Sequence, residues 1–291
     1  MYRRQRLRHL LSVPSRRPSN GRLSCATSQS SGRPSIVKVC ILASSSAGNS
    51  TFVASGCTRI LVDAGLSRKT TFERLAAIGE RPQELDAILI SHEHVDHVSG
   101  LARIAASLRI PVYISRLTAP AIAWGDDRPE LRLFEAGQSF RIGDIEVRSF
   151  TVPHDAADPV GFCLEAGGVK LGIVTDLGYI PGSVRFHLRG THFLILESNH
   201  DLDMLKVGPY PWSVKQRVMG RRGHLSNDLA ADFIREGLDA TTDTLVLGHL
   251  SEHNNHPEIV RMTAMQALAE RALRLRLVVA APGRQSEVFQ L

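Results

Sequence analysis

The chemically most distinctive part of the sequence is a dense run of histidine and acid. His92, His94, Asp96 and His97 occupy four of six consecutive positions directly after an apolar segment, residues 87–90. Side chains two residues apart in an extended chain project to the same side, so His92, His94 and Asp96 are expected to converge while His97 takes a different direction. Imidazole and carboxylate groups bind zinc, iron or manganese, and the absence of cysteine among them argues against a purely structural zinc site. The run therefore predicts ligands for two adjacent metals.

Short apolar segments and turn residues predict the elements that position this run. In the first half, strands are expected at residues 36–43, 59–62, 87–90 and 111–115, and helices at residues 67–78 and 98–108. The middle of the chain predicts strands at residues 139–142, 145–150, 161–165 and 170–175. The last part predicts helices at residues 226–235 and 257–273, with strands at residues 245–247 and 276–280. Two sets of strands with interspersed helices predict a layered α/β domain, although the pattern alone does not exclude a doubly wound sheet.

The histidine run resembles the hallmark of the metallo-β-lactamase superfamily, and the resemblance covers residues 36–291. It implies a four-layer αββα sandwich and a binuclear site. By this resemblance His92, His94 and His154 hold the first metal, and Asp96, His97 and His249 hold the second. Asp176 is the implied bridge between the metals, and Asp63 is implied to brace the metal loop rather than to bind metal.

Five further segments are similar to the WalJ/YycJ-type branch of the superfamily, which is associated with DNA exonuclease activity. They are residues 44–50, 197–201, 208–212, 223–227 and 248–255. The chain is also similar to ribonuclease Z and to phosphoribosyl cyclic phosphodiesterases, in which a histidine placed like His224 assists at the scissile phosphate. His253 and His256 are additional imidazoles after the last ligand, and we expect both to be surface residues.

The chemistry of such a site predicts a phosphodiesterase. Two divalent ions, zinc or manganese, can hold a bridging hydroxide near neutral pH, and that hydroxide would attack phosphorus. Asp96 or Asp176 would orient it. His224 precedes a helix N-terminus that favours a phosphate, and it would hold a phosphate oxygen or protonate the leaving oxygen. Asp96 and His224 are therefore the predicted catalytic residues.

Contacts to a nucleic acid substrate are expected at several places. The small-residue segment with Ser46 and Asn49 can approach a substrate oxygen closely, or be an ordinary hairpin turn, and Asn199 belongs to another of the similar segments. Tyr210 and Trp212 are candidates for base stacking or for packing, and Ser226 is expected to cap a helix rather than touch substrate. A basic cluster consists of Lys215, Arg217, Arg221 and Arg222. We expect it to neutralise phosphates of the substrate. The alternative is that these residues form a solvated surface segment.

Composition restricts the class of protein. Of 291 residues, 43% are hydrophobic and 22% charged, as in a globular protein, and no apolar run approaches the ~20 residues of a membrane span. The net charge of +6 originates in residues 1–35, which hold eight arginines and no acid. This tail is expected to be a disordered extension or an over-extended translation start, with a transit peptide as the alternative. Four cysteines without paired spacing favour the reducing cytoplasm.

The preferred function is a binuclear metal-dependent phosphodiesterase or exonuclease acting on DNA, or on RNA, without sequence specificity. The alternative is a small-molecule hydrolase of the same fold, such as a cyclic phosphodiesterase, thioesterase or lactonase. A ribonuclease J-like enzyme is disfavoured because only 72 residues separate Asp176 from His249. A catalytically silent nucleic-acid-binding protein is disfavoured because every ligand position is filled.

Overall fold

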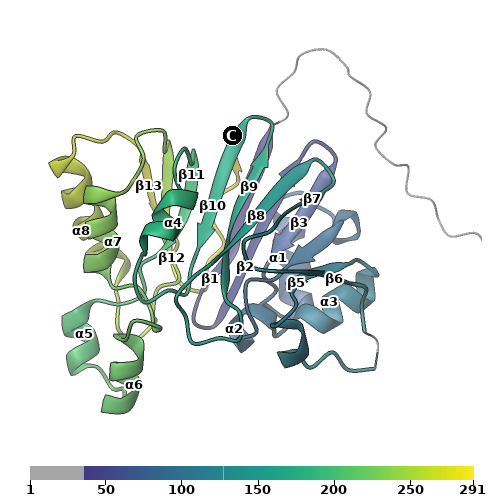
Figure 1. Cartoon of the computed structure of the whole chain (residues 1–291), viewed down its shortest axis with the longest axis horizontal. Coiled ribbons are helices and arrows are strands. Elements are labelled where there is room, and N and C mark those ends of the chain that lie inside the picture. The colour runs from purple at the N-terminus through teal and green to yellow at the C-terminus, as the bar shows by residue number, and fades with distance from the viewer. Residues whose placement is uncertain (1–35, 127) are drawn as a thin grey trace, which may run out of the picture. The chain divides into compact units, whose positions relative to one another are not determined.

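Two mixed sheets stack at the centre of the fold (Figure 1), in a computed structural model that describes residues 36–126 and 128–291. The predicted basic tail, residues 1–35, lies outside the described residues. Within the described residues each sheet has seven strands. In spatial order, the first sheet contains β14 (Phe289–Gln290), β1 (Val37–Ser45), β2 (Gly48–Ser55), β3 (Thr58–Val62), β4 (Ala87–Leu89), β5 (Val112–Ser115) and β6 (Leu131–Phe134). The second contains β13 (Arg276–Val279), β12 (Thr244–Gly248), β11 (Phe193–Glu197), β10 (Val169–Val174), β9 (Val160–Ala166), β8 (Ile145–Thr151) and β7 (Ser139–Ile142).

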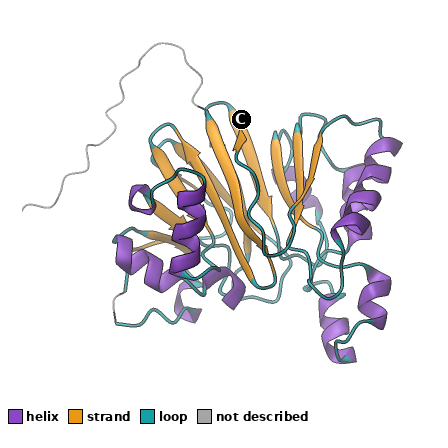
Figure 2. Ribbon diagram, turned by 180° about the vertical axis from the view of Figure 1, so that it is seen from behind, coloured by secondary structure: helices purple, strands orange, loops and turns teal. Residues whose placement is uncertain are grey.

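Helices cover the outer face of each sheet (Figure 2). The helices are α1 (Arg68–Ala77), α2 (Val95–Val98), α3 (Leu101–Leu108), α4 (Gly182–His187), α5 (Leu202–Val207), α6 (Trp212–Val218), α7 (Asn227–Glu236) and α8 (Pro257–Glu270), with 3-10 turns at Pro82–Glu84 and Ala119–Ala121. Leu75 of α1 and Ile104 of α3 are buried against the first sheet, and Phe233 of α7 and Ala264 of α8 against the second. A separate apolar cluster fills the space between the sheets. The predicted four-layer αββα sandwich is therefore confirmed.

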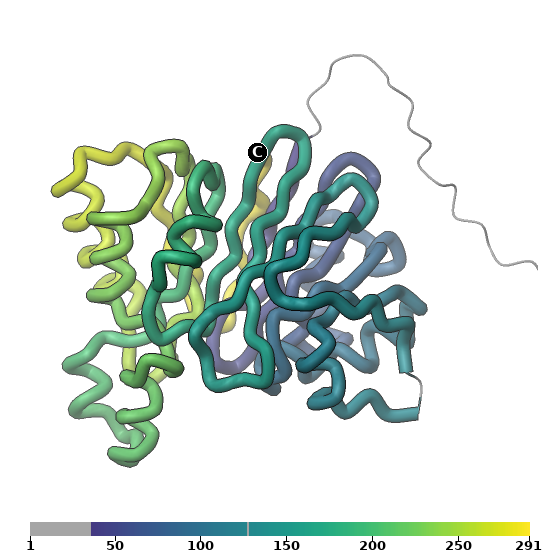
Figure 3. Tube along the Cα trace, viewed as in Figure 1, coloured from purple at the N-terminus to yellow at the C-terminus, as the bar shows by residue number. Residues whose placement is uncertain are grey.

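Both sheets follow the same plan, which determines where loops meet. In the first sheet β1, β2 and β3 are antiparallel and β3 to β6 are parallel. In the second sheet β7 to β10 are antiparallel and β10 to β13 are parallel. The last strand, β14, pairs with β1, so the two ends of the described chain lie side by side (Figure 3). Loops at the carboxyl ends of the parallel strands therefore gather at one edge, which is where α/β proteins place their sites.

Several elements differ from those expected. Residues 44–50, expected either to approach substrate or to form an ordinary hairpin turn, end β1, turn and begin β2. The single helix expected at residues 98–108 is two helices, α2 and α3, separated at Gly100. A Cβ on Gly100 would lie 1.9 Å from the carbonyl oxygen of Leu66, so the break coincides with a close backbone approach. The sequence pattern did not predict β2, an eight-residue strand, or the shorter elements β6, β14, α4, α5 and α6.

No helix among the described residues is long and apolar enough to cross a membrane.

Gly65 allows three segments of the site edge to pack closely. Its backbone N–H donates to the carbonyl oxygen of Asn49 at 2.8 Å. A Cβ at this position would lie 1.7 Å from the carbonyl oxygen of Asp96 and 2.6 Å from the backbone nitrogen of Asn49. Neither atom is the end of a flexible side chain, so any larger residue must displace the backbone of α2 or of β2.

We predict that Gly65→Ala lowers the melting temperature by about 5 to 10 °C, because overpacking costs roughly 1–3 kcal/mol and each kcal/mol is worth about 2–4 °C in a chain of this size. The measurement is a thermal melt followed by circular dichroism. Gly182→Ala is the matched control, since a Cβ there meets nothing within 4 Å. Equal melting temperatures for the two variants would contradict the close approach.

Candidate metal centre

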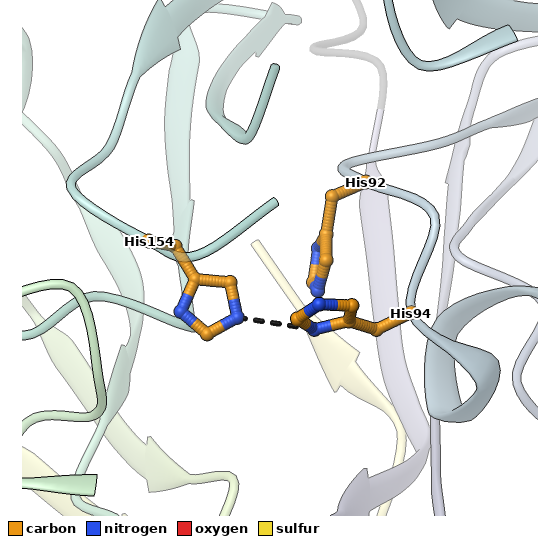
Figure 4. A group of neighbouring side chains, drawn as sticks. All are labelled: His92, His94 and His154. Atoms are coloured by element: carbon orange, nitrogen blue, oxygen red, sulfur yellow. Dashed lines mark hydrogen bonds between the residues drawn. The ribbon is translucent and has the colours of Figure 1, made fainter. Parts of the chain in front are cut away.

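Three histidines from two loops converge at the strand edge (Figure 4). His92 and His94 follow β4, and His154 follows β8. His94 Nδ1 and His154 Nε2 are 3.2 Å apart. Two nitrogens that each lie 2.0–2.1 Å from one tetrahedral ion are roughly 3.4 Å apart, so the spacing matches that of two ligands of the same ion. One nitrogen from each of the three rings lies within 4.8 Å of the others.

A second group lies beside the first. Asp96, His97 and His249 bring one ligand atom each within 4.8 Å of one another. Asp96 Oδ2 is 3.5 Å from His97 Nε2 and 3.4 Å from His249 Nε2. Asp176 stands between the groups, since its Oδ2 is 3.2 Å from His97 Nε2 and its Oδ1 is 3.8 Å from His154 Nε2. The structure thus brings together all seven residues expected to be ligands.

The histidine run is not extended throughout, which changes the expected geometry. The chain is extended up to His94, the N-cap residue of α2, and Asp96 and His97 lie in that short helix. Asp96 therefore groups with His97 and His249 rather than with His92 and His94. The expectation that His92, His94 and Asp96 converge because they alternate along an extended chain was wrong for Asp96, since the chain turns helical at Val95.

Asp63 fixes the ring of His97 from the first sheet. It follows β3 and is buried, and its Oδ2 accepts from His97 Nδ1 at 2.8 Å. The same carboxylate accepts from the backbone N–H and the hydroxyl of Ser91. Since a carboxylate only accepts, Nδ1 carries the proton and Nε2 is left to bind a cation. The geometry is that of a bracing residue.

Glu197 has a similar bracing role in the second sheet, a role that was not predicted from the sequence. It ends β11 and is fully buried. Oε1 accepts from Nδ1 of both His224 and His249 at 2.8 Å, and Oε2 accepts from the backbone N–H groups of Leu177 and Leu225. Glu197 therefore fixes one ligand and the predicted catalytic histidine together. The available signal was an acid directly after an apolar run, residues 193–196.

His154 and Asn49 complete the bracing. His154 Nδ1 donates to the carbonyl oxygen of Gly223 at 3.0 Å, so its Nε2 faces the other ligands. The Asn49 amide nitrogen is 3.0 Å from each of the Ser45 carbonyl oxygen, Asp96 Oδ2 and His97 Nε2. The structure thus uses Asn49, expected to touch substrate, to orient Asp96.

Buried acids dominate the electrostatics of the site. Burial opposes the charged form of His249, yet Asp176, Asp96 and Glu197 outweigh it and raise its pKa to about 10. Burial likewise opposes charge on Glu197, but His224 and His249 outweigh it and lower its pKa to about 2. Burial, reinforced by His97, lowers the pKa of His92 well below its usual value. The carboxylates therefore stay ionised and favour a cation.

Unpaired ligand atoms test whether a metal fits. His92 Nε2, His249 Nε2 and Asp176 Oδ2 are buried and make no hydrogen bond. Buried polar atoms are rarely left so, because each costs about 1–3 kcal/mol. Divalent cations bound by imidazole and carboxylate would satisfy all three, so these residues fit a metal site.

Three of the residues that build the site have left-handed backbone conformations. Asp63, Asp176 and His249 have φ angles of 61°, 60° and 55°, and each directly follows or lies close behind a strand, β3, β10 and β12 respectively. A left-handed backbone conformation at a residue other than glycine destabilises the fold by about 1–3 kcal/mol, and such conformations are typical of functional sites. Here the conformation turns the chain sharply at the strand edge.

A pocket of about 310 Å³ opens beside the metal centre. His224 forms part of its wall, together with Ser46 from the β1–β2 turn and Asn199 from the loop after β11. The Asn199 amide nitrogen donates to the carbonyl oxygen of His249 at 2.9 Å, so this side chain also supports the ligand loop. Ser226 is the N-cap of α7 as expected, since its hydroxyl accepts from Leu229 N–H.

The four residues of the basic cluster differ in exposure: Lys215 is buried, and the three arginines are exposed. Lys215 is buried, and its Nζ donates to the carbonyl oxygen of Lys206 at 2.7 Å, so the expectation that it binds phosphate is not met by its placement. Arg217 pairs with Asp155 at 2.5 Å, Arg221 lies 4.2 Å over the ring of Tyr179, and Arg222 donates to the His154 carbonyl oxygen. These three are exposed at the side of the site.

Two stacked mixed sheets, helices outside and histidine–carboxylate ligands at the carboxyl edge define a metallo-hydrolase of the β-lactamase type. The family described as the Beta-lactamase superfamily domain matches residues 58–275, and the chain belongs to this superfamily.

The chain is also similar to individual proteins of this superfamily. The chain is 37% identical over 234 residues to exodeoxyribonuclease YycJ of Bacillus anthracis, covering 79% of this chain and 89% of that protein. It is 36% identical over 238 residues to exodeoxyribonuclease WalJ of Streptococcus pneumoniae, covering 80% and 88%. The fold also matches the metallo-beta-lactamase fold protein YhfI from Bacillus subtilis, with a TM-score of 0.67, 16% identity and coverage of 88% and 99%.

We predict that Asp63→Ala weakens metal affinity by about 10- to 100-fold, the usual effect of losing the partner of a ligating histidine. The measurement is competition with a chromogenic chelator. Asp232→Ala, which removes an exposed acid from α7, is the control and should leave affinity unchanged. Unchanged affinity in Asp63→Ala would show that His97 needs no brace.

Proposed function

We propose that the protein is a binuclear metal-dependent phosphodiesterase that degrades DNA as an exonuclease. The proposal rests mainly on the position of His224. Its imidazole is hydrogen-bonded to Glu197, lies beside the ligand cluster and forms part of the pocket wall. The relatives named exodeoxyribonuclease support DNA as the substrate. Zinc or manganese is the proposed metal, with two ions per chain. The buried thiols of Cys40 and Cys163 fit a reducing compartment such as the cytoplasm.

The proposed division of ligands follows the two groups. His92, His94 and His154 would hold one ion, Asp96, His97 and His249 the other, and Asp176 would contact both. Bound divalent cations supply a nucleophile derived from water at neutral pH and neutralise charge on the phosphate. The protein's own contribution is to hold these seven side chains in place before substrate arrives.

Two side chains would act on protons and on the phosphate. Asp96 is ionised, because His249 and His97 outweigh its burial and lower its pKa, and Asn49 fixes its orientation. It would accept a hydrogen bond from the attacking water. His224 has Nδ1 held by Glu197, so its Nε2 would donate to a phosphate oxygen or protonate the leaving oxygen as the P–O bond breaks.

Phosphates further along the strand would meet Arg217, Arg221 and Arg222. Their guanidinium groups lie on the segment that leads into His224. Contacts of this kind neutralise phosphates without reading bases, so binding would weaken steeply with salt. The proposed substrate is therefore a nucleic acid of any sequence.

End-labelled single- and double-stranded DNA and RNA test the proposal when incubated with the metal-loaded full chain. We expect stepwise shortening of DNA from one end. A cyclic phosphodiester and a thioester are assayed in parallel. Hydrolysis of either of these, with labelled DNA left intact, would replace the nuclease by a small-molecule hydrolase.

We predict about two metal ions per chain by elemental analysis of the reconstituted protein. His94→Ala should lose metal, because it removes one of three nitrogens from the first group. His192→Ala is the control: it lies at the start of β11, the opposite end of the strand from Glu197. A wild-type value of one ion or none would refute the binuclear proposal.

We predict that His224→Ala retains the wild-type metal content but loses roughly 10²- to 10⁴-fold in kcat, the usual scale of general acid–base assistance. The residue is not needed to complete either ligand group. Steady-state rates on a small phosphodiester and elemental analysis of the same sample are the measurements. Loss of a metal in His224→Ala would assign it to the ligands instead.

A further inference from the structure

The pocket beside His224 is built from segments that lie far apart in the sequence. Its walls come from the β1–β2 turn, the loop after β11, the α5–α6 hairpin and the loop after β12. In Figure 1 the α5–α6 hairpin extends beyond the strand ends at the lower left. At about 310 Å³ the pocket is at the small end of the range for ligand sites, which suits one compact group rather than a stretch of polymer.

The two sides of the pocket differ in chemistry. Tyr210, Val214 and Val218 form an aromatic and aliphatic wall. Ser46, Asn199 and Ser251 provide hydroxyl and amide groups elsewhere in the lining. A nucleoside combines a flat base, whose face stacks on aromatic rings, with polar base edges and a hydroxylated sugar. The flexible arm of a thioester or the alkyl part of a lactone has no ring to place against Tyr210.

The aromatic wall is held in place before any ligand binds. Lys215 Nζ donates to the Lys206 carbonyl oxygen and thereby ties α6 to α5. Gly208 packs so tightly against the loop after β12 that a Cβ would lie 2.3 Å from Asn254 Oδ1. The ring of His253 meets the Tyr210 ring edge-on, with centroids 6.1 Å apart. A preorganised stacking surface loses little entropy on binding.

We propose that this pocket holds the nucleoside next to the scissile phosphate, with its base stacked on Tyr210. The inference rests on the proposed function. His224 joins the pocket to the metal centre, so a nucleoside seated there places its own phosphate at the ligands. Arg217, on the rim and 64% exposed, is positioned for the following phosphate. A base in this pocket cannot remain stacked in a duplex, so the enzyme acts on an unpaired terminal nucleotide.

The test compares two substrates that share a leaving group: thymidine 5′-(4-nitrophenyl phosphate) and methyl 4-nitrophenyl phosphate. The measured quantity is kcat/KM for the thymidine ester divided by kcat/KM for the methyl ester, each determined with the metal-loaded full chain. Tyr210→Ala should lower this ratio about tenfold to a hundredfold, the scale of base stacking on one aromatic ring. Tyr210→Phe keeps the ring and should keep the ratio. Phe186→Ala, which removes an exposed aromatic from α4, is the matched control.

Melting temperature and metal content are measured for every variant, and Tyr210→Leu provides a second ring-free side chain of apolar character. A fall of the ratio in both ring-free variants supports the inference. An unchanged ratio in them, with DNA still degraded by the wild type, overturns the nucleoside pocket and leaves the proposed function standing. Wild-type protein inactive on DNA and on both esters overturns the proposed function and this inference with it.

Discussion

The carboxylate of Glu197 holds the second half of the site together. It is fully buried, and its two oxygens accept four hydrogen bonds, from His224, His249 and the backbone of Leu177 and Leu225. A buried charge is tolerated only when its lone pairs are satisfied in this way. Because the four donors come from three different loops, satisfying Glu197 also fixes those loops relative to one another. The positions of the ligand and of the catalytic candidate are thus consequences of one buried charge.

Asp63 orients an imidazole ring from the first sheet, as Glu197 does from the second. Each sheet therefore contributes one bracing carboxylate to the site. Each carboxylate lies at the carboxyl end of a strand and takes Nδ1–H of an imidazole whose Nε2 then faces the centre. With Asp96 and Asp176 between them, the edge concentrates anionic groups in a place with little water. The raised pKa of His249 and of His97 measures that excess of negative charge. Divalent cations held by the same side chains would compensate it as well.

Local pattern predicted the parts of the site that are local. The histidine run could be found from its own residue types and from its position after an apolar strand. The remaining ligands, and the bracing role of Asp63, were implied by the resemblance to the metallo-β-lactamase superfamily, and their positions near strand ends agreed with it. The role of Glu197 could not, since its imidazole partners are 27 and 52 residues away and the fold alone unites them. Lys215 was expected to be a phosphate contact because composition shows charge but not burial. The helices α5 and α6 are six and seven residues long, too short for periodicity to reveal them.

Two elements that the sequence pattern did not predict, α5 and α6, supply residues to the pocket beside the candidate metal centre. Ligands at strand ends supply the hydrolytic chemistry, and many substrates can use the same chemistry because fold and function are separable. What lies next to the ligands selects the substrate. Here α5 and α6 lie between β11 and α7 in the chain, and the residues that connect and form them supply the aromatic wall of the pocket. Lys215 ties α6 to α5 through the Lys206 carbonyl oxygen, and Gly208 packs against Asn254 of the loop after β12. A buried lysine amine and one close backbone approach therefore hold the aromatic wall in place beside the candidate metal centre.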